Sequence, residues 1–136
     1  MKKFVFLEHT ADIKFRAFGK NLNEVFENSA LAFTSVLHDG KIKKDVNKKF
    51  LIKGNDLEAL MFRFLEEILF LFETEGFLIS NIKVKLSDDK KNLKVEAFGE
   101  EKLAGRARHY IKAVTYNDMF IKKSAGRWTA QVVIDV

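Results

Sequence analysis

The segment between Gly54 and Gly76 constrains the fold most, because its apolar residues cover most of the circumference of a helix. They recur at spacings of three and four, which predicts a helix from about Asp56 to Glu75. Asn55 with Glu58 resembles a capping box, and Gly76 is typical of a helix C-terminus. The apolar positions are Leu57, Leu60, Met61, Phe62, Phe64, Leu65, Ile68, Leu69, Phe70, Leu71 and Phe72. A helix of this kind is central to the core or partly covered by a partner, and its broad apolar surface favours the core.

A second amphipathic helix is expected earlier in the chain, from about Leu22 to Leu37. Asn21 is the predicted N-cap, and Glu24 stands in the reciprocal position of a capping box. Asp39 and Gly40 end this helix.

The remaining apolar segments mostly alternate with polar residues, as strands do. The expected strands are Lys3–Leu7, Ile13–Phe18, Lys48–Lys53, Ile82–Leu86, Leu93–Ala97, Tyr110–Tyr116, Met119–Lys122 and Trp128–Val136. Asp88 and Asp89 are predicted to turn a hairpin, and Glu100 to Arg108 is expected to be a polar loop. We therefore expect an α+β fold, with two amphipathic helices packed on a largely antiparallel or mixed β-sheet, in a single domain over residues 1–136.

The composition excludes several classes of protein. Cysteine is absent, which removes disulfide frameworks, thiolate metal sites and cysteine nucleophiles. No window is apolar enough to span a bilayer and no secretory signal is recognisable, so we expect a soluble cytoplasmic protein without membrane contact. The formal net charge of +5 permits an RNA or acidic partner without requiring one.

Three charged residues stand where strands would otherwise be apolar. Asp12 precedes the strand that starts at Ile13, Asp135 lies in the terminal "WTAQVVIDV", and Lys112 lies inside "YIKAVTY". On one interpretation, Asp135 and Lys112 face solvent on an edge strand or form an ion pair. On the other, the three residues converge, and two carboxylates with a backbone carbonyl form an oxygen-only site suited to calcium or magnesium. The sequence leaves both open.

The three histidines, His9, His38 and His109, have no metal-ligand spacing along the chain and are expected to be surface or loop residues. His9 is interpreted as local support for the entry to the second strand rather than as a ligand.

Five blocks in order along the chain resemble the archease family. They are "HTADI", "GKNLNEVFENSALAF", "NDLEALMFRFLEEILFLFETEGFL", "IKAVTYNDM" and "VVIDV". The resemblance implies a non-catalytic accessory protein of the RtcB-type tRNA-splicing ligase. Such a protein promotes guanylylation of the ligase, allows multiple turnover and relaxes its nucleotide triphosphate specificity.

The resemblance also implies a set of functional residues. Asp12, Asp135 and Val136 would bind a divalent cation, most often Ca²⁺ with Mg²⁺ as the alternative, and Val136 would use a main-chain or terminal oxygen. Lys112 matches the functional lysine of the family. Arg106, Arg108 and His109 are candidate partner or RNA contacts, although a solvated loop is the default.

Other functions compete with ligase activation. The resemblance also suggests a chaperone or specificity modulator of a tRNA cytosine methyltransferase, with indirect or weak tRNA contact. A metal-dependent hydrolase using Asp12 and Asp135 would need a general base that the sequence does not reveal. A plain RNA-binding domain would show salt-sensitive affinity for tRNA.

Overall fold

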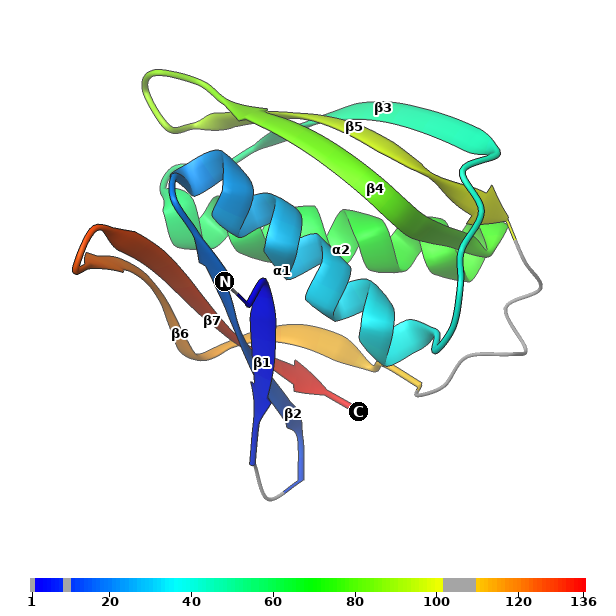
Figure 1. Cartoon of the computed structure of the whole chain (residues 1–136), viewed down its shortest axis with the longest axis horizontal. Coiled ribbons are helices and arrows are strands. Elements are labelled where there is room, and N and C mark those ends of the chain that lie inside the picture. The colour runs from blue at the N-terminus through cyan, green and yellow to red at the C-terminus, as the bar shows by residue number, and fades with distance from the viewer. Residues whose placement is uncertain (1, 9–10, 102–109) are drawn as a thin grey trace.

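Two antiparallel sheets enclose two helices in three layers (Figure 1). The computed structural model describes residues 2–8, 11–101 and 110–136. The helices are α1 (Leu22–Leu37) and α2 (Leu57–Glu75). The strands are β1 (Phe4–Leu7), β2 (Ile13–Gly19), β3 (Val46–Lys53), β4 (Phe77–Leu86), β5 (Asn92–Glu101), β6 (Ala113–Ser124) and β7 (Arg127–Asp135). The predicted α+β class is confirmed, and all strand pairs in both sheets are antiparallel.

The sheets differ in size and in the helices that they contact. Sheet A has the strand order β1-β2-β7-β6, and sheet B has the order β3-β5-β4. Helix α1 contacts β2 of sheet A and β4 of sheet B, while α2 contacts β6 of sheet A and all three strands of sheet B. Each helix therefore needs apolar residues on two sides, which explains the broad apolar surface in its sequence.

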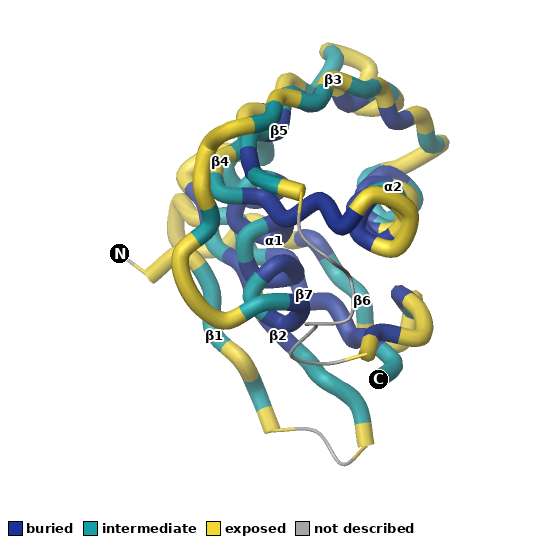
Figure 2. The backbone as a smooth tube through the Cα atoms, turned by 90° about the vertical axis from the view of Figure 1, so that its right-hand side faces the viewer, coloured by how far each residue is buried: buried dark blue, intermediate teal, exposed yellow. Residues whose placement is uncertain are grey.

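Aromatic side chains dominate the core between the layers. The fully buried phenylalanines are Phe15, Phe26, Phe33, Phe64 and Phe77. Phe26 of α1 meets Phe64 of α2 edge to face, with ring centroids 5.9 Å apart. Figure 2 shows that the buried residues lie where the helices face the sheets. The core placement of α2 is thus confirmed, although Phe70 on its outer side is 56% exposed.

Three of the four helix ends agree with the predictions: α1 starts after Asn21 and ends at Leu37, and α2 ends before Gly76. The Asn21 side chain accepts a hydrogen bond from the Glu24 N–H at 2.8 Å, and Gly76 adopts a left-handed conformation with φ 66° after α2. The predicted cap Asn55 is wrong, because Asp56 caps α2 by accepting from the Ala59 N–H at 2.8 Å. Asn and Asp cap helices equally well, so adjacent residues of these types leave the start uncertain by one position.

The strands near the C-terminus depart from the prediction. Tyr110–Tyr116 and Met119–Lys122 were expected as separate strands, but residues 113–124 form the single strand β6, and residues 110–112 precede it. The pairing of β6 with β7 shifts between Thr115 and Phe120, and this irregularity interrupts the alternation that a regular strand would show. The predicted hairpin is confirmed as β4 and β5, and Glu100 and Glu101 extend β5 instead of starting a loop.

Neither helix in the described part of the chain is long and apolar enough to cross a membrane.

Candidate functional site

The start of β2 and the end of β7 bring two carboxylates to the same end of sheet A. This end, where the strands start and stop, is called the edge below and is not an edge strand. Asp12 immediately precedes β2, and Asp135 is the last residue of β7. Ile13 pairs with Ile134, so Asp12 and Asp135 each adjoin the last residue pair of the β2–β7 ladder, and Asp12 lies in the bend that leads into β2. Both residues are half-buried.

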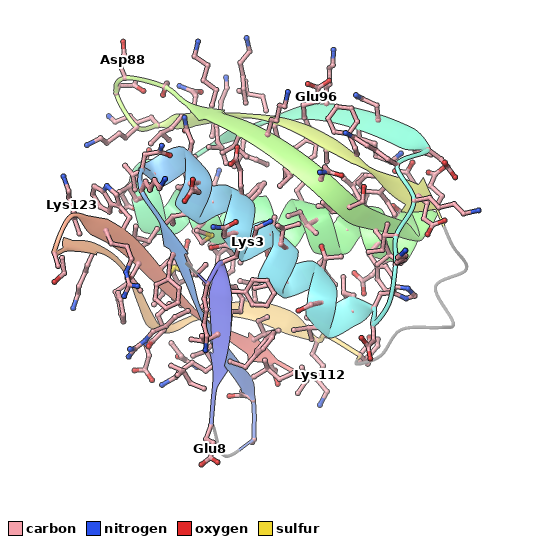
Figure 3. All side chains as sticks on the ribbon, in the orientation of Figure 1. Lys3, Glu8, Asp88, Glu96, Lys112 and Lys123 are labelled. Carbon is pink, nitrogen blue, oxygen red and sulfur yellow. The ribbon has the colours of Figure 1, made fainter. Side chains whose placement is uncertain are left out.

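Lys112 lies on the other side of β7. Ala113 pairs with Asp135, and the Lys112 N–H donates a hydrogen bond to the Asp135 carbonyl oxygen at 2.8 Å. The Lys112 side chain is exposed and extends away from the sheet (Figure 3). The structure therefore brings together the main chains of all three charged residues.

This arrangement corrects the simpler interpretation of Asp135. β7 lies between β2 and β6, so Asp135 is not on an edge strand. Among the described residues, no ion pair joins its carboxylate to the Lys112 ammonium; the link between the two residues is the backbone hydrogen bond. The contacts described for Asp135 are thus those of its main chain, with Ala113 and Lys112.

The donors at this edge fit a hard cation. Asp12 and Asp135 offer carboxylate oxygens, and Val136, whose side chain packs against the core, can offer only main-chain oxygen. Calcium and magnesium prefer such oxygen donors, whereas zinc prefers nitrogen and sulfur. Across residues 2–8, 11–101 and 110–136, no group of three or more His, Cys, Asp or Glu residues is placed to hold a metal. A cation here would therefore depend on two carboxylates completed by main-chain oxygen and water.

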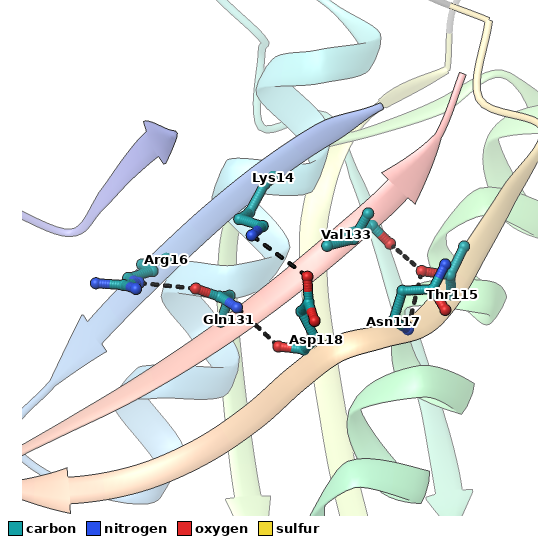
Figure 4. Close-up of polar contacts among 7 residues, drawn as sticks. All are labelled: Lys14, Arg16, Thr115, Asn117, Asp118, Gln131 and Val133. Carbon is teal, nitrogen blue, oxygen red and sulfur yellow. Dashed lines mark hydrogen bonds and ion pairs between the residues drawn. The ribbon is translucent and has the colours of Figure 1, made fainter. Parts of the chain in front are cut away.

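A polar network that the sequence analysis missed covers the same face of sheet A (Figure 4). The Gln131 side chain accepts a hydrogen bond from Arg16 Nε at 2.9 Å and donates one to the Asp118 carbonyl oxygen at 2.7 Å. Lys14 Nζ lies 3.5 Å from the Asp118 carboxylate. Gln131 is only 5% exposed, so these bonds compensate for burying its amide. A polar residue inside the apolar run "AQVVI" was the signal that could have revealed the network.

The network supports an irregular segment of β6 close to Lys112. Asp118 has a φ of 54°, a left-handed conformation that is costly for a non-glycine residue. The Thr115 hydroxyl donates to the Val133 carbonyl oxygen at 2.9 Å and accepts from the Asn117 N–H at 3.3 Å. These bonds fix the segment to β7.

Two aromatic rings join this segment to the core helix. Tyr116 stacks on Phe62 of α2, with ring centroids 4.2 Å apart and ring planes 3° from parallel, while half of the tyrosine remains exposed. The surface beside Lys112 is therefore held in place from two sides, by β7 and by α2.

Several of the predicted residues fall outside the described part of the chain. These are His9, Arg106, Arg108 and His109. His38 is described, and it provides the C-cap of α1, where its N–H donates to the Thr34 carbonyl oxygen at 2.9 Å.

The fold defines a class of small α+β protein in which two antiparallel sheets enclose two helices, here with Asp12 and Asp135 beside the last residue pair of β2 and β7. The model of the Archease protein family (MTH1598/TM1083) matches residues 4–136. The chain belongs to the archease family.

Relatives of known sequence and structure agree with this assignment. The chain is 40% identical to protein archease of Pyrococcus furiosus, over 100% of both chains, and 39% identical to that of Methanosarcina mazei, over 99% of this chain and 97% of the relative. The solution structure of protein 1598 of Methanobacterium thermoautotrophicum superposes with a TM-score of 0.86 at 37% identity, covering both chains completely. An archease of Thermotoga maritima, described as a possible chaperone, shares the fold with a TM-score of 0.65 at 22% identity, over 96% and 94% of the two chains.

Proposed function

We propose that this chain is a non-catalytic accessory protein of an RtcB-type tRNA-splicing ligase in the cytoplasm. It promotes guanylylation of the ligase, allows repeated turnover and relaxes the choice of nucleotide triphosphate. The observation that carries the proposal is the strand order β2-β7-β6, because it gathers Asp12, Asp135 and Lys112 at one edge of sheet A. Family membership supplies the link to tRNA splicing.

Each residue has a defined part in this proposal. Asp12 and Asp135, with main-chain oxygen from Val136, would hold a divalent cation, of which Ca²⁺ and Mg²⁺ are the candidates. Such a cation, when bound, supplies positive charge to anionic oxygens. The exposed ammonium of Lys112 binds an anionic group such as a phosphate, since lysine acts there as a mobile point charge. Electrostatic placement of this kind assists phosphoryl and nucleotidyl transfer without chemistry by the assisting protein.

The test measures guanylylation of the purified cognate ligase with wild type and with Asp12→Ala, Lys112→Ala and Asp135→Ala. We expect each variant to lose most of the stimulation. Lys122→Ala is the matched control, because Lys122 is an exposed lysine near the far end of β6, the strand that Lys112 precedes. Full stimulation by all three edge variants would refute the proposal. Turnover by the chain alone, incubated with nucleotides and RNA, would refute its non-catalytic part.

A second candidate is a chaperone or specificity modulator of a tRNA cytosine methyltransferase. The observation that favours it is the exposed apolar surface formed by Phe70 of α2 and Leu51 of β3, which are 56% and 51% exposed and line one open depression. Phe70→Ser should then weaken suppression of methyltransferase aggregation and leave ligase guanylylation unchanged. If Phe70→Ser suppresses aggregation as well as wild type does, this surface has no such role.

A further inference from the structure

The outer face of sheet B carries an ordered array of lysines. Two rows cross the three strands: Lys49, Glu96 and Lys83 are aligned in one, and Leu51, Lys94 and Lys85 in the next. Lys53 continues the array along β3, opposite Asn92. Aligned residues share a face, and the alternate residues of these strands contribute to the core, so the five lysines all belong to the solvent side.

The array of lysines does not stabilise the folded protein. Lys85 and Lys94 are directly opposite each other, and like charges at such positions destabilise a sheet. Glu96 is the only acidic residue in the two rows, and its carboxylate lies 3.8 Å from Lys49 Nζ and also accepts a hydrogen bond from Asn47 Nδ2 at 2.9 Å. The two rows and Lys53 together therefore carry a net charge of about +4, from five lysines and one glutamate.

Lys48, on the same strand as Lys49 and Lys53, differs from them because it is paired with carboxylates within the fold. It alternates with the outward residues of β3 and points inward, where Nζ lies 2.7 Å from Glu75 and 3.2 Å from Glu101. The hydrogen bond to Glu75 raises the pKa of Lys48. Among residues 2–8, 11–101 and 110–136, none of the outward lysines has a comparable pair of carboxylates, so their charge remains available to a partner.

The shape and composition of the face indicate which partner it fits. All six residues of the two rows line an open depression of about 590 Å³ on this side, together with the intervening Phe50, Val84 and Val95. Leu51 is its one exposed large apolar residue, and Phe98, the outward aromatic ring of β5, lies under Lys44, with Nζ 4.8 Å from the ring centroid. Protein interfaces are depleted in lysine and enriched in aromatic residues, which argues against a protein partner. Within the described part of the chain, this face exposes no aromatic ring among its large apolar residues, which also argues against stacking on single-stranded bases.

We propose that the outer face of sheet B, defined by Lys49, Lys53, Lys83, Lys85 and Lys94, binds the phosphate backbone of duplex RNA without reading its sequence. The choice of RNA rests on the proposed role in tRNA splicing, whereas the charge array is independent of that role. Sheet B and the edge that carries Lys112 lie on opposite sides of the molecule, so the chain can contact RNA and a ligase at the same time (Figures 1 and 3).

The test is fluorescence anisotropy with a labelled 16-base-pair RNA duplex in 50–200 mM KCl, with EDTA and without ligase. Four of the five lysines lie outside the Lys49–Glu96 pair: Lys53, Lys83, Lys85 and Lys94. They predict a slope of log K against log salt near −3.6, from about −0.9 for each phosphate contact. Lys85→Glu with Lys94→Glu should weaken binding about tenfold or more at 50 mM KCl and reduce the magnitude of the slope by about 1.8. The matched control is Lys122→Glu with Lys123→Glu, which changes the charge equally on exposed residues of β6 and should bind nearly as wild type.

A second variant separates binding from folding. Lys94→Glu alone creates an opposite-charge pair with Lys85, so its melting temperature should equal or exceed that of wild type while its affinity for RNA falls. Absence of wild-type binding at 50 mM KCl would overturn the proposal. Equal losses in the Lys122/Lys123 control, or equal competition by polyglutamate of the same charge, would also overturn it. Because no ligase or metal is present, a failure here is distinct from a failure of the proposed function.

Discussion

Replacing Asp135 with asparagine tests whether the carboxylates at the edge of sheet A form a cation site. Asp12 and Asp135 each adjoin the Ile13–Ile134 pair, and for this test we take their charges to lie about 6 Å apart, the order of the spacing between side chains on neighbouring strands. Two unit charges at that distance repel by about 0.7 kcal/mol in water and about 3 kcal/mol at an effective dielectric constant of 20. Both residues are half-buried, and we take about 1 kcal/mol as the repulsion that Asp135→Asn removes.

The expected result reverses when calcium is added. In EDTA, Asp135→Asn should melt about 3 °C higher than wild type, since 1 kcal/mol corresponds to a shift of that size in a domain of this length. Calcium at 100 times its dissociation constant should stabilise wild type by about 2.7 kcal/mol, or about 8 °C. The variant should gain far less, because a neutral amide binds the cation more weakly than a carboxylate.

The measurement is thermal unfolding followed by circular dichroism, in EDTA and over a calcium titration. Asp88→Asn is the matched control, because Asp88 is an exposed acid in the β4–β5 turn on the opposite side of the molecule (Figure 3). If millimolar calcium leaves the wild-type melting temperature unchanged, or raises that of Asp135→Asn equally, the edge is not a cation site.

Three further predictions concern stability. Burial raises the pKa of Glu27 above its ordinary value of 4.5, against the opposing effect of the Val84 N–H that donates to it, so its ionisation costs stability as the pH rises. Glu27→Gln should therefore melt higher than wild type at pH 7 by a margin that shrinks toward pH 4; a constant margin would contradict the assignment. Gly99→Ala should destabilise by about 3 kcal/mol in urea unfolding, because its Cβ would lie 1.8 Å from the Leu78 carbonyl oxygen and separate β5 from β4; an unchanged midpoint would show that the strands adjust freely. Phe64→Ala should cost about 3–5 kcal/mol in the same assay, since Phe64 is fully buried between the layers, and a loss below 1 kcal/mol would mean that the core collapses around the cavity.

Local patterns predicted most of the secondary structure. The period of three to four residues located both helices, and alternation located the β4–β5 hairpin, because each pattern reflects which side of one element is buried. The same patterns failed in β6, where the irregularity between Thr115 and Phe120 breaks the alternation. They also missed the Gln131 network, because its members come from β2, β6 and β7 and meet only in the folded sheet.

The candidate site shows a similar division. Asp12, Lys112 and Asp135 stood out in the sequence because charged residues interrupt apolar strands, and each was identified from its own neighbours. Their proximity could not be derived in that way, because β2 and β7 lie near opposite ends of the chain.

The sequence by itself determined where helices and strands form and which of their faces are apolar, since these depend on side chains close together in the chain. Only the tertiary structure decided that β7 lies between β2 and β6, and hence that the main chains of Asp12, Asp135 and Lys112 come together. Strands pair through backbone groups that are the same in every residue, so the choice of partner depends on how both sheets and both helices pack together. The lysine array on sheet B likewise became a single surface only when β3, β5 and β4 were aligned.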